Sequence, residues 1–173
     1  MAQRAAFALL ALGGIAACSP PPSDEAVERE RPVAEPTFAS DPLPSPVIEG
    51  AAWAKTSDKR IIYGIAGEPA LMALECDDAG EEPVLRVTRM SPADEGAGAL
   101  LALIGNGHIG RLEVDATEVS GRILWQGELP ADDPRWAPIA GPRQVTATIP
   151  GAGMLTINPS PAPMGLLALC RQA

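Results

Sequence analysis

The sequence predicts an all-β fold, an antiparallel β-sandwich or small barrel of about eight short strands. After residue 50, apolar and polar residues alternate mostly with a period of two. This is the pattern of strands that turn one face to a core and the other to water. Turn-forming residues separate the alternating runs roughly every 8–12 residues, as in small all-β domains. These observations favour strands over long helices.

The predicted strands follow one another from residue 60 to the C-terminus. They cover residues 60–66, 70–76, 84–90, 99–104, 111–115, 122–128, 144–149, 155–157 and 166–171. The segments between them are rich in Asp, Gly, Ser and Pro, which favour turns. Only single helical turns are expected, near residues 93–96 and 133–137.

Residues 105–110, GNGHIG, match the glycine pattern of a dinucleotide-binding turn and follow an apolar run. That pattern must open a helix, because the helix N-terminus holds the pyrophosphate. Here the following residues alternate like a strand. Asn106-Gly107 is instead the strongest signal for a two-residue hairpin turn, and it would pair Ile104 with Ile109. The core face of this predicted hairpin consists of Ala99, Leu101, Leu103, Leu112 and Val114.

The first 18 residues have a different character. Arg4 precedes an apolar run over residues 5–17, which is shorter than the ~20 residues that a transmembrane helix needs. The run ends in Ile15-Ala16-Ala17-Cys18, an aliphatic residue and two small residues before a cysteine. This resembles the lipobox, the cleavage and acylation signal of bacterial lipoproteins. An uncleaved anchor, or an ordinary signal peptide cut near Ala17 without acylation, stays open as an alternative.

The resemblance implies three parts: a signal peptide at residues 1–17, a lipidated Cys18 with a linker to residue 50, and a β-rich globular domain at 51–173. The linker is rich in Pro and Glu, and we expect it to be disordered. Acyl chains on Cys18 would anchor the protein in a lipid bilayer of the cell envelope, with the domain facing the periplasm. Ser19 follows the cysteine, where an Asp marks inner-membrane retention in enteric lipoproteins, so the outer membrane is favoured.

Two cysteines remain once Cys18 is assigned to lipid. Cys76 and Cys170 form an even pair in an oxidising compartment, so a disulfide between them is the default expectation. Such a bridge would fix the last predicted strand to the middle of the domain and stabilise it by roughly 4–5 kcal/mol on the chain-entropy model. Two separate buried thiols are the alternative.

The charge of the chain limits its partners. The formal net charge is −9 at pH 7, and removing residues 1–17 takes away one more arginine. Nucleic acid is therefore not an expected partner, because its phosphates need Lys and Arg. Anionic head groups would repel so acidic a chain, so its anchoring should depend on the lipid alone.

No cofactor, metal or catalytic residue is predicted. His108 is the only histidine, and there is no G-x-S-x-G nucleophile motif. An enzyme or metal carrier that depends on His108 is a less favoured alternative, since thioethers beside His108 would suit Cu(I). The four methionines after residue 50 lack H-x-M or M-x-M spacing; they are Met72, Met90, Met154 and Met164.

The segment of greatest interest for binding is residues 132–139, where Arg135 and Trp136 lie between two prolines. Arg and Trp dominate binding hot spots, so this loop could recognise an envelope protein, for example as an inhibitor. The interpretation that the sequence favours, however, is that Trp136 turns inward and closes one end of the barrel. Taken together, the sequence predicts a membrane-anchored lipoprotein whose domain is a non-catalytic binding or scaffolding module.

Overall fold

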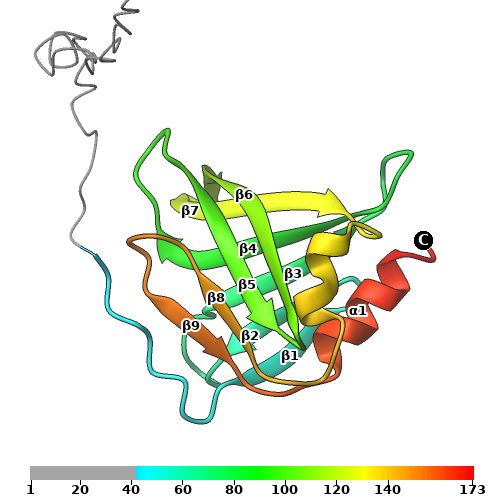
Figure 1. The fold of residues 1–173 in the computed structure, drawn as a ribbon. Coiled ribbons are helices and arrows are strands. Elements are labelled where there is room, and N and C mark those ends of the chain that lie inside the picture. Colours follow the sequence, from blue (N-terminus) through cyan, green and yellow to red (C-terminus); the bar gives the residue numbers. More distant parts are fainter. Residues whose placement is uncertain (1–41) are drawn as a thin grey trace, which may run out of the picture. The chain divides into compact units, whose positions relative to one another are not determined.

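The computed structural model describes residues 42–173, and within this range it is a nearly closed antiparallel β-barrel (Figure 1). The predicted signal peptide, Cys18 and most of the predicted linker lie outside the described residues. The strand order in the sheet is β1-β2-β3-β4-β7-β6-β5-β8-β9. None of the helices in the described range is long and apolar enough to cross a membrane.

The barrel has nine described strands and two helical segments. The strands are β1 (Ala52–Ser57), β2 (Arg60–Gly64), β3 (Met72–Asp77), β4 (Val84–Pro92), β5 (Gly98–Gly105), β6 (His108–Val119), β7 (Arg122–Pro130), β8 (Val145–Thr148) and β9 (Met154–Ile157). A 3₁₀ helix, η2 (Pro134–Ile139), follows β7, and an α-helix, α1 (Ala162–Cys170), ends the chain. The all-β prediction is therefore confirmed.

The β5–β6 hairpin forms as the sequence predicts. Ile104 pairs with Ile109, and the turn between the strands consists of Asn106 and Gly107. Both turn residues have positive φ angles, 51° and 82°, which Asn and Gly tolerate best. The side chain of Asn106 also donates hydrogen bonds to the carbonyl oxygens of Pro138 (2.7 Å) and Gly141 (3.1 Å). The turn is thus tied to the segment before β8.

One hydrophobic core fills the barrel. It consists of the inward-facing residues of the strands together with residues of η2 and α1. The five predicted core residues of the β5–β6 hairpin belong to this core, Ala99 as a partly buried member. Its largest fully buried side chains include Trp136, Tyr63, Met72, Leu74, Leu85, Leu101, Leu103, Leu112, Ile149, Leu155 and Leu167.

The barrel is closed by side chains where β1 and β9, the two ends of the sheet, face each other. The Tyr63 hydroxyl donates to the carbonyl oxygen of Thr156 (3.3 Å) and accepts from the backbone N–H of Asn158 (3.0 Å). The side chain of Asn158 donates to the carbonyl oxygen of Ala51 (2.8 Å). These bonds satisfy edge groups that would otherwise need a neighbouring strand.

The prediction of a C-terminal strand at residues 166–171 is wrong, because this segment lies in α1. A short apolar run fits either a buried strand or a buried helix, and alternation alone does not separate them. Leu166, Leu167 and Cys170 are buried, a spacing that suits one face of a helix. Pro163 lies in the first turn of α1, where a proline is tolerated.

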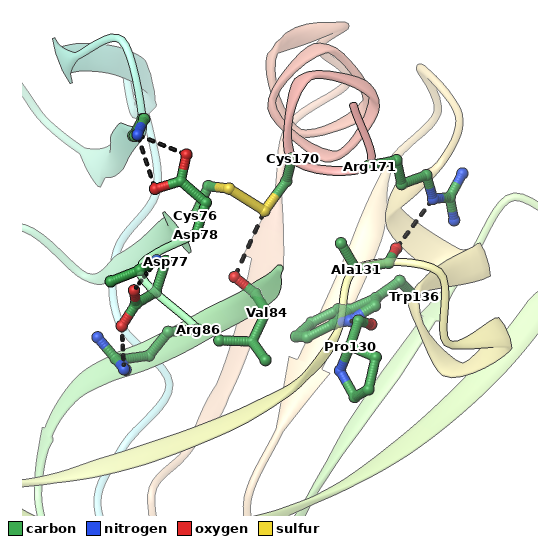
Figure 2. Close-up of a disulfide and its surroundings, with 12 residues drawn as sticks. Cys76, Asp77, Asp78, Val84, Arg86, Pro130, Ala131, Trp136, Cys170 and Arg171 are labelled. Carbon is green, nitrogen blue, oxygen red and sulfur yellow. Dashed lines mark hydrogen bonds and ion pairs between the residues drawn. A yellow bond between two sulfur atoms is a disulfide. The ribbon is translucent and has the colours of Figure 1, made fainter. Parts of the chain in front are cut away.

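The predicted disulfide between Cys76 and Cys170 is present, with a Cα–Cα distance of 5.5 Å (Figure 2). It joins β3 to α1 instead of joining two strands. Both cysteines are buried, and Cys170 Sγ lies 3.4 Å from the carbonyl oxygen of Val84 on β4. The bridge holds the C-terminal helix against this end of the barrel.

Candidate functional site

The barrel interior is occupied by side chains, so the candidate sites lie on the surface. Two hollows, of about 200 and 340 Å³, are both lined by Trp53 on β1. The larger lies between β1, β2 and α1, and its size falls in the range of ligand pockets. Its charged lining residues, Lys55 and Asp58, form an ion pair of 2.7 Å with each other. The charged groups of the larger hollow are therefore engaged with each other, and in the lining of the smaller hollow Glu68 is the one charged residue.

Of the two interpretations of Trp136, the structure agrees with the favoured one, in which the side chain turns inward, and not with the one in which it is presented to a partner. Its side chain has no exposed surface, and its indole N–H donates to the carbonyl oxygen of Pro130 (3.1 Å). Figure 2 shows the indole beneath the Cys76–Cys170 bridge, next to Pro130. Trp136 therefore belongs to the core, as the favoured interpretation of the sequence predicted.

The η2 segment fits the barrel because β6 and β7 pair with each other only from Asp115 onward. Gly110, near the start of β6, faces inward against η2, and a Cβ there would overlap the carbonyl oxygen of Arg135. The glycine thus permits a close backbone approach that any other residue would prevent. The space beside the first half of β6 is taken by η2, with Trp136 as its inward side chain.

Arg135 remains at the surface, but its guanidinium is engaged locally. It donates to both carboxylate oxygens of Asp133, at 2.9 and 2.7 Å. The same carboxylate caps η2 by accepting the backbone N–H of Arg135 (2.8 Å). The side-chain bond from Arg135 lowers the pKa of Asp133 below its ordinary value. This ion pair stabilises the start of η2. Because Trp136 is buried, Arg135 does not form a binding surface together with that side chain.

His108 is exposed beside the hairpin turn, opposite Gly105 in the β5–β6 register. Met72 is buried in the core, whereas Met154 and Met164 are exposed on β9 and α1. Within residues 42–173, no group of three or more His, Cys, Asp or Glu side chains could hold a metal ion. The expectations of no catalysis, no metal and no cofactor remain predictions.

Two acidic residues at the end of β3, Asp77 and Asp78, form ion pairs with neighbouring cations (Figure 2). Asp77 accepts from Arg86 (3.0 Å), and Asp78 accepts from Lys59 (2.6 Å). Arg86 also pairs with Glu128 (2.7 Å) on β7. Bonds from the Ala79 N–H and from Arg86 lower the pKa of Asp77. These carboxylates make surface ion pairs, which contribute little to stability, and they carry no further feature of a site.

Sequence reasoning did not identify Arg89 on β4 as a buried cation. Only 4% of the residue is exposed, and desolvation lowers the pKa of its guanidinium. It donates to the carbonyl oxygens of Leu71 (2.7 Å) and Ala152 (3.5 Å). Arg89 thus connects the residue before β3 with the β8–β9 turn, which is a structural role.

The surface feature that most resembles an interaction site is an apolar patch on the outside of the barrel. We call it the outer apolar face, and it comprises Leu100, Ala102, Ile104, Ile109 and Met154. Four of these side chains are largely exposed: Ile109 by 58%, Leu100 by 49%, Ile104 by 48% and Met154 by 47%. Exposed apolar side chains that gather on one face of a sheet can mark a contact surface.

The strand register places these residues on one face of the sheet, with Leu100 opposite Glu113 and with Thr148 between Ala102 and Met154. Ile104 on β5 lies opposite Ile109 on β6, and Ala102 lies opposite Arg111. On its other side, β5 pairs with β8, which in turn pairs with β9. Thr146, Thr148 and Thr156 fill the intervening outward positions, and Met154 lies opposite Thr148. The predicted hairpin already placed Ile104 opposite Ile109, away from the core face, and this was the signal that could have revealed the patch.

The charges along the outer apolar face are separated. Arg111 lies near the Asn106-Gly107 end of the hairpin, and Arg143 donates its backbone N–H to Asn106 at the same end (3.1 Å). In the part of the chain that the structure describes, neither arginine has an ion-pair partner. Glu113 and Asp115 occupy the outward positions of β6 farther from the turn. The face thus has a basic end and an acidic end.

Residues 42–50, which we call the lead-in segment, run beside β9 (Figure 1). Leu43 donates its backbone N–H to the carbonyl oxygen of Gly151 (2.8 Å), and the N–H of Met154 donates to the hydroxyl of Ser45 (3.1 Å). This part of the predicted linker therefore packs on the barrel. Its path is possible because Gly153 has no Cβ, which would meet the carbonyl oxygen of Pro44.

The exposed large apolar side chains are concentrated in this region. Of the eight in the described range, four lie on the outer apolar face and two, Leu43 and Val47, in the lead-in segment. The other two, Met164 and Leu169, are on α1. The outer apolar face and the lead-in segment are therefore the most apolar part of the described surface.

No protein-family model matches the chain, and no curated protein or solved structure is significantly similar to it.

Proposed function

We propose that this chain is a lipid-anchored protein of the bacterial cell envelope, in which a non-catalytic barrel binds or scaffolds another component. Acylated Cys18 is the anchor, the outer membrane is the favoured location, and the domain faces the periplasm. The observation that carries the proposal is the lipobox-like Ile15-Ala16-Ala17-Cys18 followed by a domain with a disulfide.

The Cys76–Cys170 disulfide supports the location. Disulfides persist in oxidising compartments such as the periplasm and are rare in reducing ones. Both cysteines are buried and come together across the end of the barrel, as a structural bridge does. This arrangement is consistent with an exported chain that has a lipidated N-terminus and a disulfide-bridged domain.

The filled barrel supports binding over catalysis. A catalytic site needs a nucleophile or a general acid–base group in a cleft, and His108 is the only imidazole in the chain. His108 is exposed beside a turn. The outer apolar face, in contrast, offers four exposed apolar side chains for contact with another component. An inhibitor that presents Trp136 is no longer proposed, since that side chain is in the core.

The proposal is tested by the intact mass of the protein extracted from a membrane fraction, with and without reductant. We expect a chain that begins at Cys18 and carries acyl groups, with a mass two hydrogens lower before reduction. A Cys18→Ser chain expressed in parallel should lack the acyl mass. A mass that begins at Met1, or one without lipid in the native chain, would refute the anchor.

A further inference from the structure

We propose that the outer apolar face contacts the surface of the bilayer that holds the anchor, so that the domain lies on the membrane in one orientation. This inference rests on the proposed acylation of Cys18. It names a lipid surface as the partner of the outer apolar face. A domain suspended away from the bilayer would have no face that is preferentially turned to the lipid.

The first argument is the composition of the face. Interfacial membrane contacts combine apolar side chains with arginines whose long stems reach past them to the head groups. Ile104 and Ile109 project side by side at about half exposure, and Arg111 is the next outward residue along β6. The remaining outward positions of the patch on β8 and β9 are mainly threonines, which add no charge.

The second argument is the place where the chain reaches the barrel. Pro42 begins the described residues, and the lead-in segment passes Gly151 and Met154, at one edge of the face. Residues 19–41, a connection of 23 residues, join this point to Cys18. A covalent connection of this length raises the effective concentration of the face at the bilayer far above that of a free domain. Contacts that are too weak to recruit a free domain are then sufficient.

The third argument is the direction of the charges. Arg111 and Arg143 lie toward the Asn106-Gly107 turn, whereas Glu113 and Asp115 lie toward the other end of β6. Head groups that carry phosphate attract the basic end and repel the acidic end. The hairpin turn should therefore lie nearer to the lipid phosphates. The net negative charge of the whole chain keeps this attraction weak and makes it depend on the anchor.

A second copy of the chain is the competing occupant of the face. A stable dimer buries about 800 Å² on each partner. Four half-exposed side chains supply on the order of a few hundred Å². The exposed apolar area is thus small for a dimer, whereas a tethered lipid contact needs no minimum area of this size.

The test is photolabelling of the native acylated chain in vesicles of phosphatidylethanolamine and phosphatidylglycerol that contain a phospholipid with a diazirine in its acyl chain. After illumination, the labelled residues are located by peptide mass spectrometry. We expect adducts concentrated in residues 100–111 and at Met154, with few on α1. Acylation is measured on the same sample, so a chain without acyl groups refutes the proposed function, whereas an acylated chain without this labelling pattern refutes only the present inference.

Matched variants identify the face. Ile104→Ser combined with Ile109→Ser should lower the labelling of the hairpin about tenfold, because two apolar side chains lose their contact with lipid. Met164→Ser combined with Leu169→Ser, two exposed apolar residues on α1, should leave it unchanged. Because all four side chains are exposed, melting temperatures should stay close to that of the native chain. Equal labelling of the hairpin in both double variants would overturn the proposal.

An experiment without lipid distinguishes contact with the bilayer from contact with a second copy of the chain. The mature chain with Cys18→Ser is examined by sedimentation over a range of concentrations without vesicles. A monomer throughout, together with labelling of the anchored chain, supports the lipid contact. A dimer that is lost in the Ile104→Ser, Ile109→Ser variant would assign the face to self-association and overturn the proposal. Even labelling over the whole domain would overturn it as well.

Discussion

The hydroxyl of Tyr63 lies 3.3 Å from the carbonyl oxygen of Thr156, and this contact joins two strands that are not neighbours in the sheet. Tyr63 is on β2, the second strand from one end, whereas Thr156 is on β9 at the other end. The same hydroxyl accepts the N–H of Asn158. A single phenol group therefore occupies the seam between β1 and β9 and satisfies a donor and an acceptor of the β9 edge.

Tyr63→Phe should weaken this seam without disturbing the core. The ring stays in place against Trp53, 5.3 Å away between ring centroids, and only the hydroxyl is lost. Two edge groups then lose their partner, and we expect the free energy of unfolding to fall by about 1–3 kcal/mol. Urea denaturation measures this loss, and hydrogen exchange should show faster exchange at Asn158. An unchanged exchange rate there would mean that another group closes the seam.

Removing the Cys76–Cys170 bridge should destabilise the domain by roughly 4–5 kcal/mol on the chain-entropy model. The two cysteines are separated by 94 residues, so the closed loop covers most of the domain. The paired Cys76→Ala, Cys170→Ala chain, compared with the native chain in urea with and without reductant, measures the effect. Reductant should shift only the native chain. An equal midpoint for both chains without reductant would show that the bridge contributes nothing.

In the chain without the bridge, the backbone amides of α1 should be the first to lose protection from hydrogen exchange. Apart from the disulfide, α1 is attached mainly by Leu166, Leu167 and the bond from Arg171 to the carbonyl oxygen of Ala131 (2.9 Å). Hydrogen exchange of the bridge-free chain should therefore rise in α1 while β5 and β6 keep their protection. Uniform exchange over the whole barrel would instead show that α1 and the sheet unfold together.

The elements that sequence reasoning predicted correctly depend on local signals. The β5–β6 hairpin follows from Asn106-Gly107 and the alternation on either side, since the residues that determine its register are adjacent in the chain. Helix α1 was missed because Leu166-Leu167-Ala168-Leu169 is a short apolar run, and its disulfide and packing, not its periodicity, decide its conformation. The Tyr63 seam could not be predicted, because its partners are more than 90 residues away.

The candidate sites also differ in how far local sequence signals could predict them. The disulfide was predictable from cysteine number, while Trp136 supported two opposite interpretations from the same residues. Its environment depends on the divergence of β6 and β7, which appears only in three dimensions. The outer apolar face was implicit in the predicted hairpin register, but its extension to Met154 depends on the order β5-β8-β9.

Trp136→Ala should destabilise the domain by about 3–5 kcal/mol, because it removes a fully buried side chain beside β6. Trp136→Phe is the matched control: it keeps an aromatic ring but loses the bond to the carbonyl oxygen of Pro130, and we expect a smaller loss. Thermal and urea unfolding measure both. If Trp136→Ala left stability unchanged and abolished binding of an envelope protein, the loop would be a recognition element after all.

Asp133 makes the start of η2 sensitive to acid. Its folded-state pKa lies below the ordinary value of 3.8, chiefly because of the side-chain bond from Arg135. A carboxyl group with a lowered pKa contributes stability that is complete above its unfolded-state value and is lost as pH falls through the folded-state value. The contribution of Asp133 should therefore be constant near neutral pH and disappear in the acid range below about pH 4.

Two substitutions separate the charge of Asp133 from its role as a cap. Asp133→Asn keeps an oxygen that can accept the backbone N–H of Arg135, whereas Asp133→Ala removes it. We expect Asp133→Ala to cost about 0.5–2 kcal/mol at neutral pH, and Asp133→Asn to cost less. The difference between the native chain and Asp133→Asn should vanish in acid, while the difference between Asp133→Asn and Asp133→Ala should persist, because only the first depends on the carboxylate charge. Urea denaturation of all three chains at neutral and acid pH measures both differences, and a native-to-Asn difference that is independent of pH would exclude the ion pair with Arg135 as its cause.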